Sequence, residues 1–445
     1  MDSTMSPLSG YRAALYMCFT GARDALFNLC DALATHPTAR SFVELSQAAC
    51  FERRWPSLYA AVSDGRIDRA ALRTLFVQTL PRPAAEARLV LALDSSPIPR
   101  PYARTAADRT LVHVPAEGRV LPRGAAPVRP GWAFSTLVVV PDPVSSWTHL
   151  LDNRRIPSTQ TAVQVAATQL ADVLPLLPVR PLCLLDGGYG NAPWVQASAG
   201  LPCDHLVRVA ATRVLYRPAP PPTGKRGAPR KDGPRFKGSD PATHGEPAAT
   251  WAGTDDNGHA VTVRCWGQLH LKVCRAVPIT AVCLTRAAAE GTTRDPRETW
   301  FWWLGGHPLP PLDAVDRLYP RRFGLEHGYR FDKQDLLWAA PHVRTPEQME
   351  RWTDVVSAVH NELGLARDLA QAQRLPWEAA TRPLTPRQVR RGLGRIIAQL
   401  GTPAAPPRPR GKSPGRSQGA VMTPAPRHPV IRKGPVRRSK RRRAA

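Results

Sequence analysis

The sequence is poor in acidic residues. Its 35 Asp and Glu are outnumbered by 61 Lys and Arg, which gives a formal net charge of +26 and a sequence pI near 10.8. An excess of this size predicts attraction to a polyanion, and nucleic acid is the first candidate. A membrane surface fits less well, because the basic residues do not lie on an amphipathic helix.

Long apolar runs are also absent. No stretch approaches the eighteen or so residues that a membrane-spanning helix needs. Residues 1–26 lack the basic start and the continuous apolar segment of a signal peptide. We therefore expect a soluble, cytoplasmic chain with no membrane partner.

Closely spaced cysteine pairs are the third absence. None of the eight cysteines forms a C-x2-C pair, which argues against a zinc site. Several cysteines stand inside apolar, strand-like runs and are expected to be small buried hydrophobic residues. A reducing compartment is the simplest inference.

The most informative stretch that is present is residues 318–338, LYPRRFGLEHGYRFDKQDLLW. It carries four polar residues spaced as Y-x2-R-x3-E-x6-K: Tyr319, Arg322, Glu326 and Lys333. These offsets follow the helical repeat, so one continuous helix would place all four on one stripe. Such a helix is expected to begin near Tyr319, because Pro320 is tolerated in a first turn.

A stripe with a phenol, a guanidinium, a carboxylate and an ammonium group is poorly suited to packing in a core. It suits a surface that holds a metal ion and a phosphate backbone together. The alternative is an exposed helix with ordinary salt bridges between residues four apart, such as Arg322 to Glu326.

Two aspartates upstream each follow a short, wholly apolar run. Residues 89–93 lead into Asp94, and residues 182–185 lead into Asp186. Such runs are typical of strands that are buried on both faces. A single aspartate after a strand is more often a turn residue or a helix cap. Two of them, followed in order by the carboxylate on the helical stripe, favour a functional set.

These motifs resemble those of bacterial insertion-sequence transposases of the DDE superfamily, which carry a YREK signature and a ribonuclease H-like catalytic domain. The resemblance implies a metal-binding catalytic triad of Asp94, Asp186 and Glu326. It also implies that the other signature residues contact phosphates near the scissile bond: Tyr319, Arg322 and Lys333. Some relatives have a second acid beside the first aspartate, where this chain has Ser95, but that acid is not a triad member.

The expected chemistry follows from the carboxylates. Three of them from separate elements suit hard divalent cations, with positions left for water and phosphate. Two Mg²⁺ ions roughly 3.5–4 Å apart, for which Mn²⁺ can substitute, would activate an attacking oxygen and stabilise the leaving one. Asp94 would bridge both ions, and Asp186 and Glu326 would each hold one. Water as the nucleophile gives cleavage, and a DNA 3′-hydroxyl gives strand transfer.

The expected fold is α/β: a ribonuclease H-like core with a β-rich insertion, helical terminal regions and a disordered basic tail. Residues 1–85 are predicted to be helical, either a DNA-binding module or a cap on the catalytic domain. Residues 86–210 form the first part of the core, with a helix over 159–174 and five strands: Arg88 to Asp94, Trp132 to Val140, Trp147 to Leu151, Pro181 to Asp186 and His205 to Val209.

Residues 211–300 are predicted to interrupt that core. A Pro-rich basic loop comes first and is expected to bind phosphates non-specifically through Lys225, Arg226, Arg230 and Lys231. Four strand-like runs follow: Val261 to Trp266, Leu269 to Val273, Ile279 to Thr285 and Thr299 to Leu304. The resemblance implies an insertion domain here, in which Trp251 or Trp266 could stack on a flipped base, although each is also a good core residue.

The remaining segments are the second part of the core, residues 301–342, then C-terminal helices over 343–400 and a tail over 401–445. Thr345 with Gln348 forms a predicted capping box, and a helix over 384–400 should carry arginines on its surface: Arg387, Arg390, Arg391 and Arg395. The tail has no Asp or Glu and should be disordered alone.

The sequence thus predicts a DNA transposase that acts on double-stranded DNA, on the terminal inverted repeats of its element and on target DNA. It is expected to self-associate on DNA and to lie with the nucleoid. Two alternatives remain: a metal-dependent DNA nuclease without strand transfer, and an inactive, transposase-derived DNA-binding protein.

Overall fold

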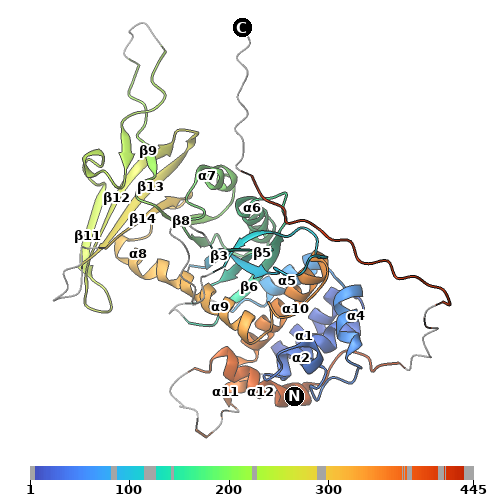
Figure 1. The fold of residues 1–445 in the computed structure, drawn as a ribbon. Helices are drawn as coiled ribbons and strands as arrows, with labels where there is room; N and C mark the ends of the chain where they lie inside the picture. Colours follow the sequence, from blue (N-terminus) through green and yellow to red (C-terminus); the bar gives the residue numbers. More distant parts are fainter. Residues whose placement is uncertain are drawn as a thin grey trace.

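The computed structural model describes residues 6–81, 88–114, 127–141, 145–222, 228–287, 297–372, 374, 376–377, 383–408, 415 and 417–434. Over these residues the chain forms a mixed α/β structure around a sheet of twelve strands, with helices on both faces of its central part (Figure 1). The α/β class predicted from the sequence is therefore confirmed.

The helices are α1 Ser6–Cys18, α2 Arg23–Thr35, α3 Phe42–Leu45, α4 Pro56–Asp64, α5 Arg69–Gln78, α6 Ala162–Val173, α7 Ala192–Ser198, α8 Leu312–Leu318, α9 Phe323–Gln334, α10 Pro346–Leu365, α11 Arg367–Ala372 and α12 Pro386–Leu400, with short 3₁₀ turns η1 Leu174–Leu176, η2 Pro241–Thr243 and η3 Tyr319–Arg322.

The strands are β1 Phe19–Gly21, β2 Arg66–Ile67, β3 Val90–Pro99, β4 Thr110–His113, β5 Val128–Val139, β6 His149–Ile156, β7 Leu182–Leu185, β8 Asp204–Val209, β9 Val214–Tyr216, β10 Arg235–Lys237, β11 Ala249–Thr254, β12 Ala260–Leu271, β13 Cys274–Arg286 and β14 Arg297–Leu304. Strands β1 and β2 form a separate two-stranded sheet.

Five strands of the large sheet form the centre, in the order β6-β5-β3-β7-β8. The first three are antiparallel to one another, whereas β3, β7 and β8 are parallel. Helices α6 and α7 cover one face of these strands, and η3 and α9 lie on the other, whereas α8 packs against β11 and β12. This order and the alternation of helix and strand are consistent with a ribonuclease H-like domain.

Strand β3 is longer than the sequence predicts. It runs through Asp94 and on to Pro99, because β5 pairs with it along that whole length. The prediction that Asp94 ends its strand is therefore wrong for the β5 side of β3. It is correct for the β7 side, where pairing stops at Leu93 with Leu185.

The insertion extends the central sheet. Strand β14 pairs with β8, and β13, β12 and β9 follow in order, so one sheet runs through both parts (Figure 1). Two runs predicted as separate strands, Val261 to Trp266 and Leu269 to Val273, are joined in β12, with a register shift between Trp266 and Leu269.

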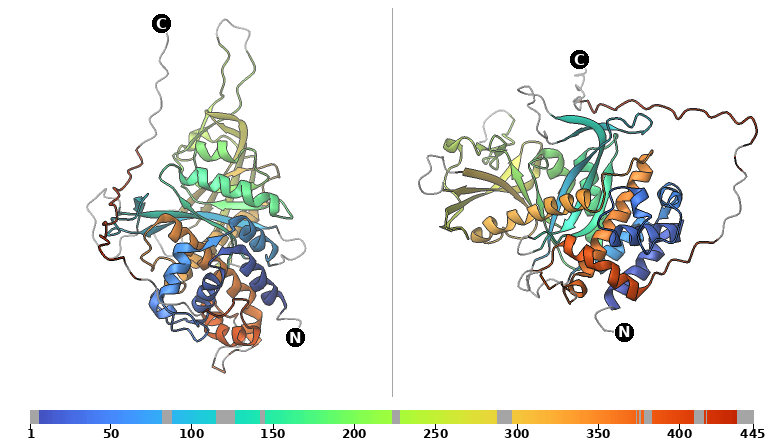
Figure 2. Two further views of the ribbon diagram at one scale, coloured as in Figure 1. Left: turned by 90° about the vertical axis from the view of Figure 1, so that its right-hand side faces the viewer. Right: turned by 60° about the horizontal axis from the view of Figure 1, so that its bottom comes forward.

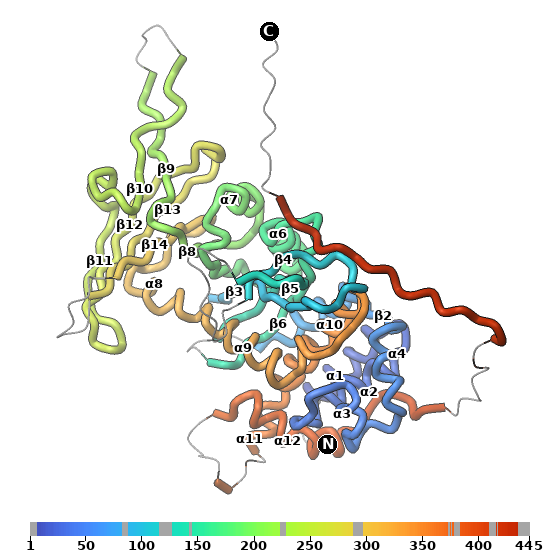
Figure 3. The backbone as a smooth tube through the Cα atoms, viewed as in Figure 1, coloured from blue at the N-terminus to red at the C-terminus, as the bar shows by residue number. Residues whose placement is uncertain are grey.

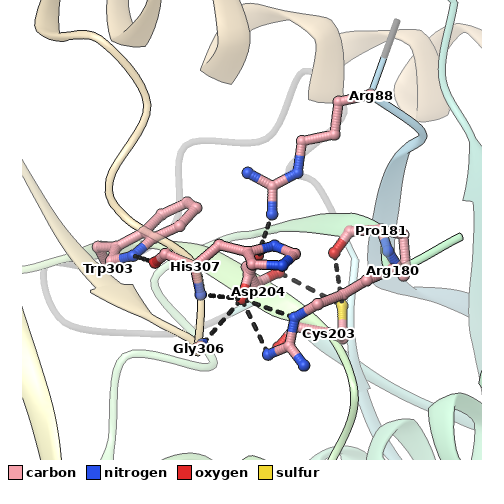
Figure 4. Close-up of polar contacts among 8 residues, drawn as sticks. All are labelled: Arg88, Arg180, Pro181, Cys203, Asp204, Trp303, Gly306 and His307. Carbon is pink, nitrogen blue, oxygen red and sulfur yellow. Dashed lines mark hydrogen bonds and ion pairs between the residues drawn. The ribbon is translucent and has the colours of Figure 1, made fainter. Parts of the chain in front are cut away.

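A buried ionic cluster ties the segment that follows β14 to the start of β8 (Figure 4). The Asp204 carboxylate at the start of β8 is fully buried and accepts hydrogen bonds from Arg180 at 2.9 and 3.0 Å. Arg88 and His307 also contact this carboxylate. Burial alone would raise the pKa of Asp204, but the Arg180 hydrogen bonds and the other donors lower it below its usual value. This carboxylate fixes the turn between β14 and α8.

The signature stretch forms η3 and α9, which continue directly from α8 across the sheet (Figure 2). The prediction that a helix begins near Tyr319 is wrong, because helical structure already starts at Leu312. Pro320 lies inside the 3₁₀ turn, where its missing N–H costs less than it would in an α-helix interior.

The helices at the two ends of the chain share one hydrophobic core, and we call α1–α5 with α10–α12 the helical lobe. Inside it, one Arg12 guanidinium nitrogen lies 2.8 Å from Asp31 and 2.5 Å from Glu362. Burial raises the pKa of both acids, and Arg12 opposes that rise. The terminal segments are therefore one structural unit.

Helix caps in this lobe agree with the sequence. The predicted capping box of Thr345 with Gln348 begins α10, and Asp68 caps α5. Arg390 is not on the surface as predicted. It is 1% exposed, because its guanidinium donates to the carbonyls of Leu33 and His36 at the end of α2.

All eight cysteines are free thiols. Of the helices that the structure describes, none is both long enough and apolar enough to cross a membrane.

Candidate active site

The two predicted aspartates lie side by side. Leu93 of β3 pairs with Leu185 of β7, so the residues that follow, Asp94 and Asp186, occupy neighbouring positions on parallel strands. Ala92 and Leu184, two residues before them, pack in the core on the face that η3 and α9 cover. Because alternate residues of a strand share a face, both carboxylates belong to the face that α9 covers.

Helix α9 brings the third predicted acid to the same place. Arg322, which directly precedes the helix, donates to Asp94 Oδ2 at 2.6 Å and to Glu326 Oε1 at 3.0 Å. The side chain of Arg322 is 8% exposed, and that of Glu326 is 51% exposed. The salt bridge between Arg322 and Glu326 is thus present, but the same guanidinium also joins the signature stretch to β3.

The surroundings of Asp94 are unfavourable for its negative charge. Burial raises the pKa of this carboxyl to about 6. The Arg322 charge opposes the rise, whereas the charges of Asp186 and Glu326 add to it. Three acids close enough to affect one another in this way create a strong preference for a cation between them.

The donor set fits a hard divalent cation, because the three candidate ligands are carboxylates from separate elements. Among the described residues, however, no three His, Cys, Asp or Glu side chains are close enough together to hold one ion. The Arg322 guanidinium occupies the position between Asp94 and Glu326. It is the cation that this structure places there.

Two other signature residues also face the sheet. Tyr319 is 8% exposed, and its ring lies 4.7 Å from the ring of Phe301. Lys333 is half-buried, and its ammonium donates to the Pro97 carbonyl at 3.1 Å. Burial lowers the pKa of Lys333, against the opposing effect of Asp332. Both residues therefore anchor α9 to the sheet, in addition to any role with phosphate.

Arg208 was not found from the sequence. Leu185 pairs with Val207, so Arg208 on β8 lies beside Asp186, on the same face of the sheet. Its side chain is exposed, and within the described parts of the chain it makes no ion pair. Burial raises the pKa of Tyr319, and the Arg208 charge is among those that oppose this rise. The only sequence signal for Arg208 was its place in a strand, DHLVRV, of otherwise buried residues.

Tyr329 is a second residue that the sequence did not single out. Its hydroxyl donates to the Asp94 carbonyl at 3.0 Å, and its ring stacks on Trp338 at 5.9 Å. This contact fixes α9 against the backbone of the residue that carries the first acid.

The predicted basic loop is not at this site. Lys225 and Arg226 lie outside the described residues. Arg230 and Lys231 are exposed in the segment between β9 and β10, at the outer end of the insertion (Figure 1). Neighbouring Asp232 is held by Arg275 of β13. These cations are therefore remote from the acids.

The two tryptophans considered for base stacking differ. Trp266 is 3% exposed and stacks on Trp300, with ring centroids 5.6 Å apart. It is a core residue of the insertion. Trp251 is half-buried on β11, and a side chain at Gly253 would collide with its ring.

Comparison with known families gives one match. The model of a family described as DDE superfamily endonuclease matches residues 14–270, which is more than half of the chain. The matched range contains Asp94 and Asp186 and ends before Glu326. Comparison with curated proteins gives no match.

Proposed function

The chain belongs to the DDE superfamily endonuclease family, and from this premise we propose that it is a DNA transposase. In this proposal it cuts DNA at the ends of an insertion sequence and joins those ends to target DNA. The observation that carries the proposal is the arrangement of Asp94 and Asp186 on adjacent strands, with Arg322 linking Asp94 to Glu326.

The three carboxylates, Asp94, Asp186 and Glu326, would hold the proposed Mg²⁺ or Mn²⁺ ions. When bound, the ions supply Lewis acidity for in-line displacement at phosphorus. A nuclease-type activity needs no covalent intermediate with the protein.

The residues around the acids position the DNA. Arg208 presents an exposed cation next to Asp186 and can bind a phosphate of the strand being cut. Arg322 could exchange its carboxylate partners for a phosphate of bound DNA, because its planar guanidinium suits phosphate as well as carboxylate. Lys333 and Tyr329 hold α9 in place through the Pro97 and Asp94 carbonyls.

The proposed substrate is double-stranded DNA with terminal inverted repeats, and two copies of the chain would assemble on the paired ends. The net charge of +26 supports a polyanionic substrate. Release from the carboxylates leaves Arg322 free to neutralise phosphate charge close to the scissile bond.

The test is to remove one ligand charge at a time. Asp94→Asn, Asp186→Asn and Glu326→Gln should each abolish cleavage of DNA that carries the element ends, because metal assistance supplies several kcal/mol of barrier reduction. DNA affinity should stay within about threefold of wild type, since phosphate contacts elsewhere are retained.

A matched control is Asp172→Asn, which alters an exposed acid on α6 that pairs with Arg154. It should leave cleavage unchanged. Near-normal cleavage by any triad variant would remove that residue from the site. Joining of the cut ends to a second duplex distinguishes a transposase from a nuclease that only cuts.

A further inference from the structure

The C-terminal tail does not simply leave the molecule. After α12, the chain makes one set of contacts with the helical lobe: the Ala405 N–H donates to Asp24, and Arg53 donates to the Ala405 carbonyl. Residues 417–434 lie outside the lobe and end against the sheet (Figures 1 and 3). Residues 417–427 are exposed and make no hydrogen bond with any other described part of the chain.

The return point is residues 428–433, HPVIRK, which we call the docking strand. The sequence predicts disorder here, but Ile431 forms a parallel bridge with Thr110 of β4. The His428 N–H donates to the Arg104 carbonyl, and the Ile431 N–H donates to the Arg109 carbonyl, each at 2.8 Å. The docking strand thus lies along β4, at the edge of the sheet, and is joined to it by one bridge.

Side chains complete this contact. Arg109 is 3% exposed, and its guanidinium donates to the carbonyls of Ala106, Arg100 and His428, the last at 3.0 Å. Without the tail, this buried group would lose one of its three acceptors, which is costly for a buried charge. The Lys433 ammonium donates to the carbonyls of Pro157 at 3.0 Å and Gln160 at 2.5 Å.

The docking site lies at the same end of the sheet as the candidate active site. It is built from the loop after β3 and from the turn after β6. Because β6 is parallel to β3, both segments lie at the same end of the sheet, the end at which Asp186 follows β7. Pro99, where β3 ends, is five residues beyond Asp94, or roughly 17 Å along the strand.

We propose that the docking strand delivers the terminal basic cluster of the tail to DNA at the catalytic end of the sheet. The cluster follows at once in the sequence: Arg437, Arg438, Lys440, Arg441, Arg442 and Arg443. This inference rests on the proposed DNA-binding function and adds where the tail acts.

The lengths of chain make the proposal quantitative. Ser439 is six residues beyond Lys433, a span of roughly 20 Å when the chain is fully extended. At about 3.4 Å per base pair, a docked tail reaches a window of roughly a dozen base pairs. If the docking strand is released, the nearest upstream anchor is Ala405, and the reach grows to more than about 100 Å.

The first experiment needs no DNA. Ile431→Pro removes the N–H that donates to the Arg109 carbonyl, and Val430→Pro is its control, because the Val430 N–H makes no hydrogen bond to any described residue. By hydrogen exchange of the full-length protein, residues 428–433 should exchange at least about tenfold more slowly in wild type and in Val430→Pro than in Ile431→Pro. Exchange at the unstructured rate in wild type would overturn the docking.

The second experiment locates the cluster on DNA. A photo-cross-linking amino acid at position 439, in place of Ser439, should label a confined window of a duplex carrying an element end. Combined with Ile431→Pro, the same probe should label a window several-fold wider, whereas Val430→Pro should leave it narrow. Labelled windows of equal width with and without Ile431→Pro would refute the proposal that the docking strand positions the basic cluster on DNA, even if docking itself is retained. Absence of labelling by a protein that still binds the duplex would also refute delivery, whereas loss of duplex binding altogether would refute the proposed DNA-binding function.

Discussion

At the scale of single residues, Arg322 links the acid on β3 to the acid on α9. Burial alone would lower the pKa of Arg322, but the charge of the Asp94 carboxylate, with those of other nearby groups, outweighs this effect and raises the pKa. A guanidinium can donate to two carboxylates at once because its donors are spread over a planar fork, whereas an ammonium is a point charge. Arg322 therefore sets the relative position of β3 and α9 before any DNA is bound.

We expect Arg322→Ala to reduce cleavage at saturating DNA by about 100-fold, because small displacements of reacting groups are costly. Binding should weaken less than about threefold, since one phosphate contact among many is lost. Lys333→Ala should behave in the same way. Arg322→Lys, which keeps the charge but cannot bridge two acids, should restore binding fully and cleavage only in part. Proportional loss of binding and cleavage would contradict the positioning role.

His205 is a buried residue with a predictable effect on stability. It is 2% exposed on β8, and neither ring nitrogen has a hydrogen-bond partner among the described residues. Burial lowers the pKa of His205 to about 4, whereas an unfolded histidine titrates near 6.5. Unfolding therefore takes up a proton between these values, and stability falls as the pH decreases through this window.

We expect His205→Leu to remove that dependence. Between pH 6.5 and 4 the free energy of unfolding should fall in both proteins. The fall should be smaller in the variant than in wild type, by up to about 3 kcal/mol. Urea denaturation at several pH values measures this. His149, whose pKa burial also lowers to about 4, remains in both proteins and cancels from the comparison. Parallel pH profiles would show that His205 does not contribute.

At the scale of elements, the close packing of α9 on the sheet depends on a glycine. A side chain at Gly328 would place its Cβ 2.9 Å from the Thr148 hydroxyl and 3.8 Å from the ring of His360. His360 is itself fixed, because its Nδ1 lies 2.7 Å from an Asp332 oxygen of α9. The helix that carries Glu326 therefore has little freedom to move outward.

We expect Gly328→Ala to lower cleavage by roughly tenfold or more. The added Cβ would displace the part of α9 that carries Glu326, and small displacements of reacting groups are costly. The matched control is Gly364→Ala in α10, where nothing lies within 4 Å of the added Cβ. The control should raise stability by about 0.5–1 kcal/mol through helix propensity and leave cleavage unchanged. Thermal unfolding and a cleavage assay on both variants decide the matter. Equal activities would show that α9 tolerates the shift.

At the scale of the whole molecule, a large share of the positive charge lies in the C-terminal tail. The tail from residue 401 onward carries thirteen Lys and Arg and no acid. Its first residues belong to the helical lobe, since the Gly401 carbonyl accepts from Arg12 and the Ala405 N–H donates to Asp24. A truncation that tests the tail alone should therefore begin after Arg408 and not at residue 401.

We expect this truncation to flatten the dependence of DNA affinity on salt. Each phosphate that the tail neutralises contributes roughly 0.9 to the slope of log affinity against log salt, so about four contacts shift it by roughly 3 to 4. Cleavage at saturating DNA should persist, because no triad residue lies in the tail. An unaltered slope would show that the tail does not touch DNA.

The sequence by itself determined those features that depend on neighbours along the chain. Apolar runs fixed β3 and β7 and therefore placed Asp94 and Asp186, because a buried strand has to be apolar on both faces. Local capping determined where α5 and α10 begin. The spacing of the signature residues determined that Arg322 and Glu326 meet, since residues four apart are neighbours on a helix.

Only the tertiary structure decided the contacts between residues distant in sequence. Pairing of β8 with β7 placed Arg208 beside Asp186, and pairing of β14 with β8 joined the insertion to the core sheet. The burial of Arg390 and the return of Ile431 to Thr110 likewise depend on surfaces made elsewhere in the chain. A strand or tail carries no local mark of its partner, because sheet pairing uses backbone groups that every residue except proline has in full.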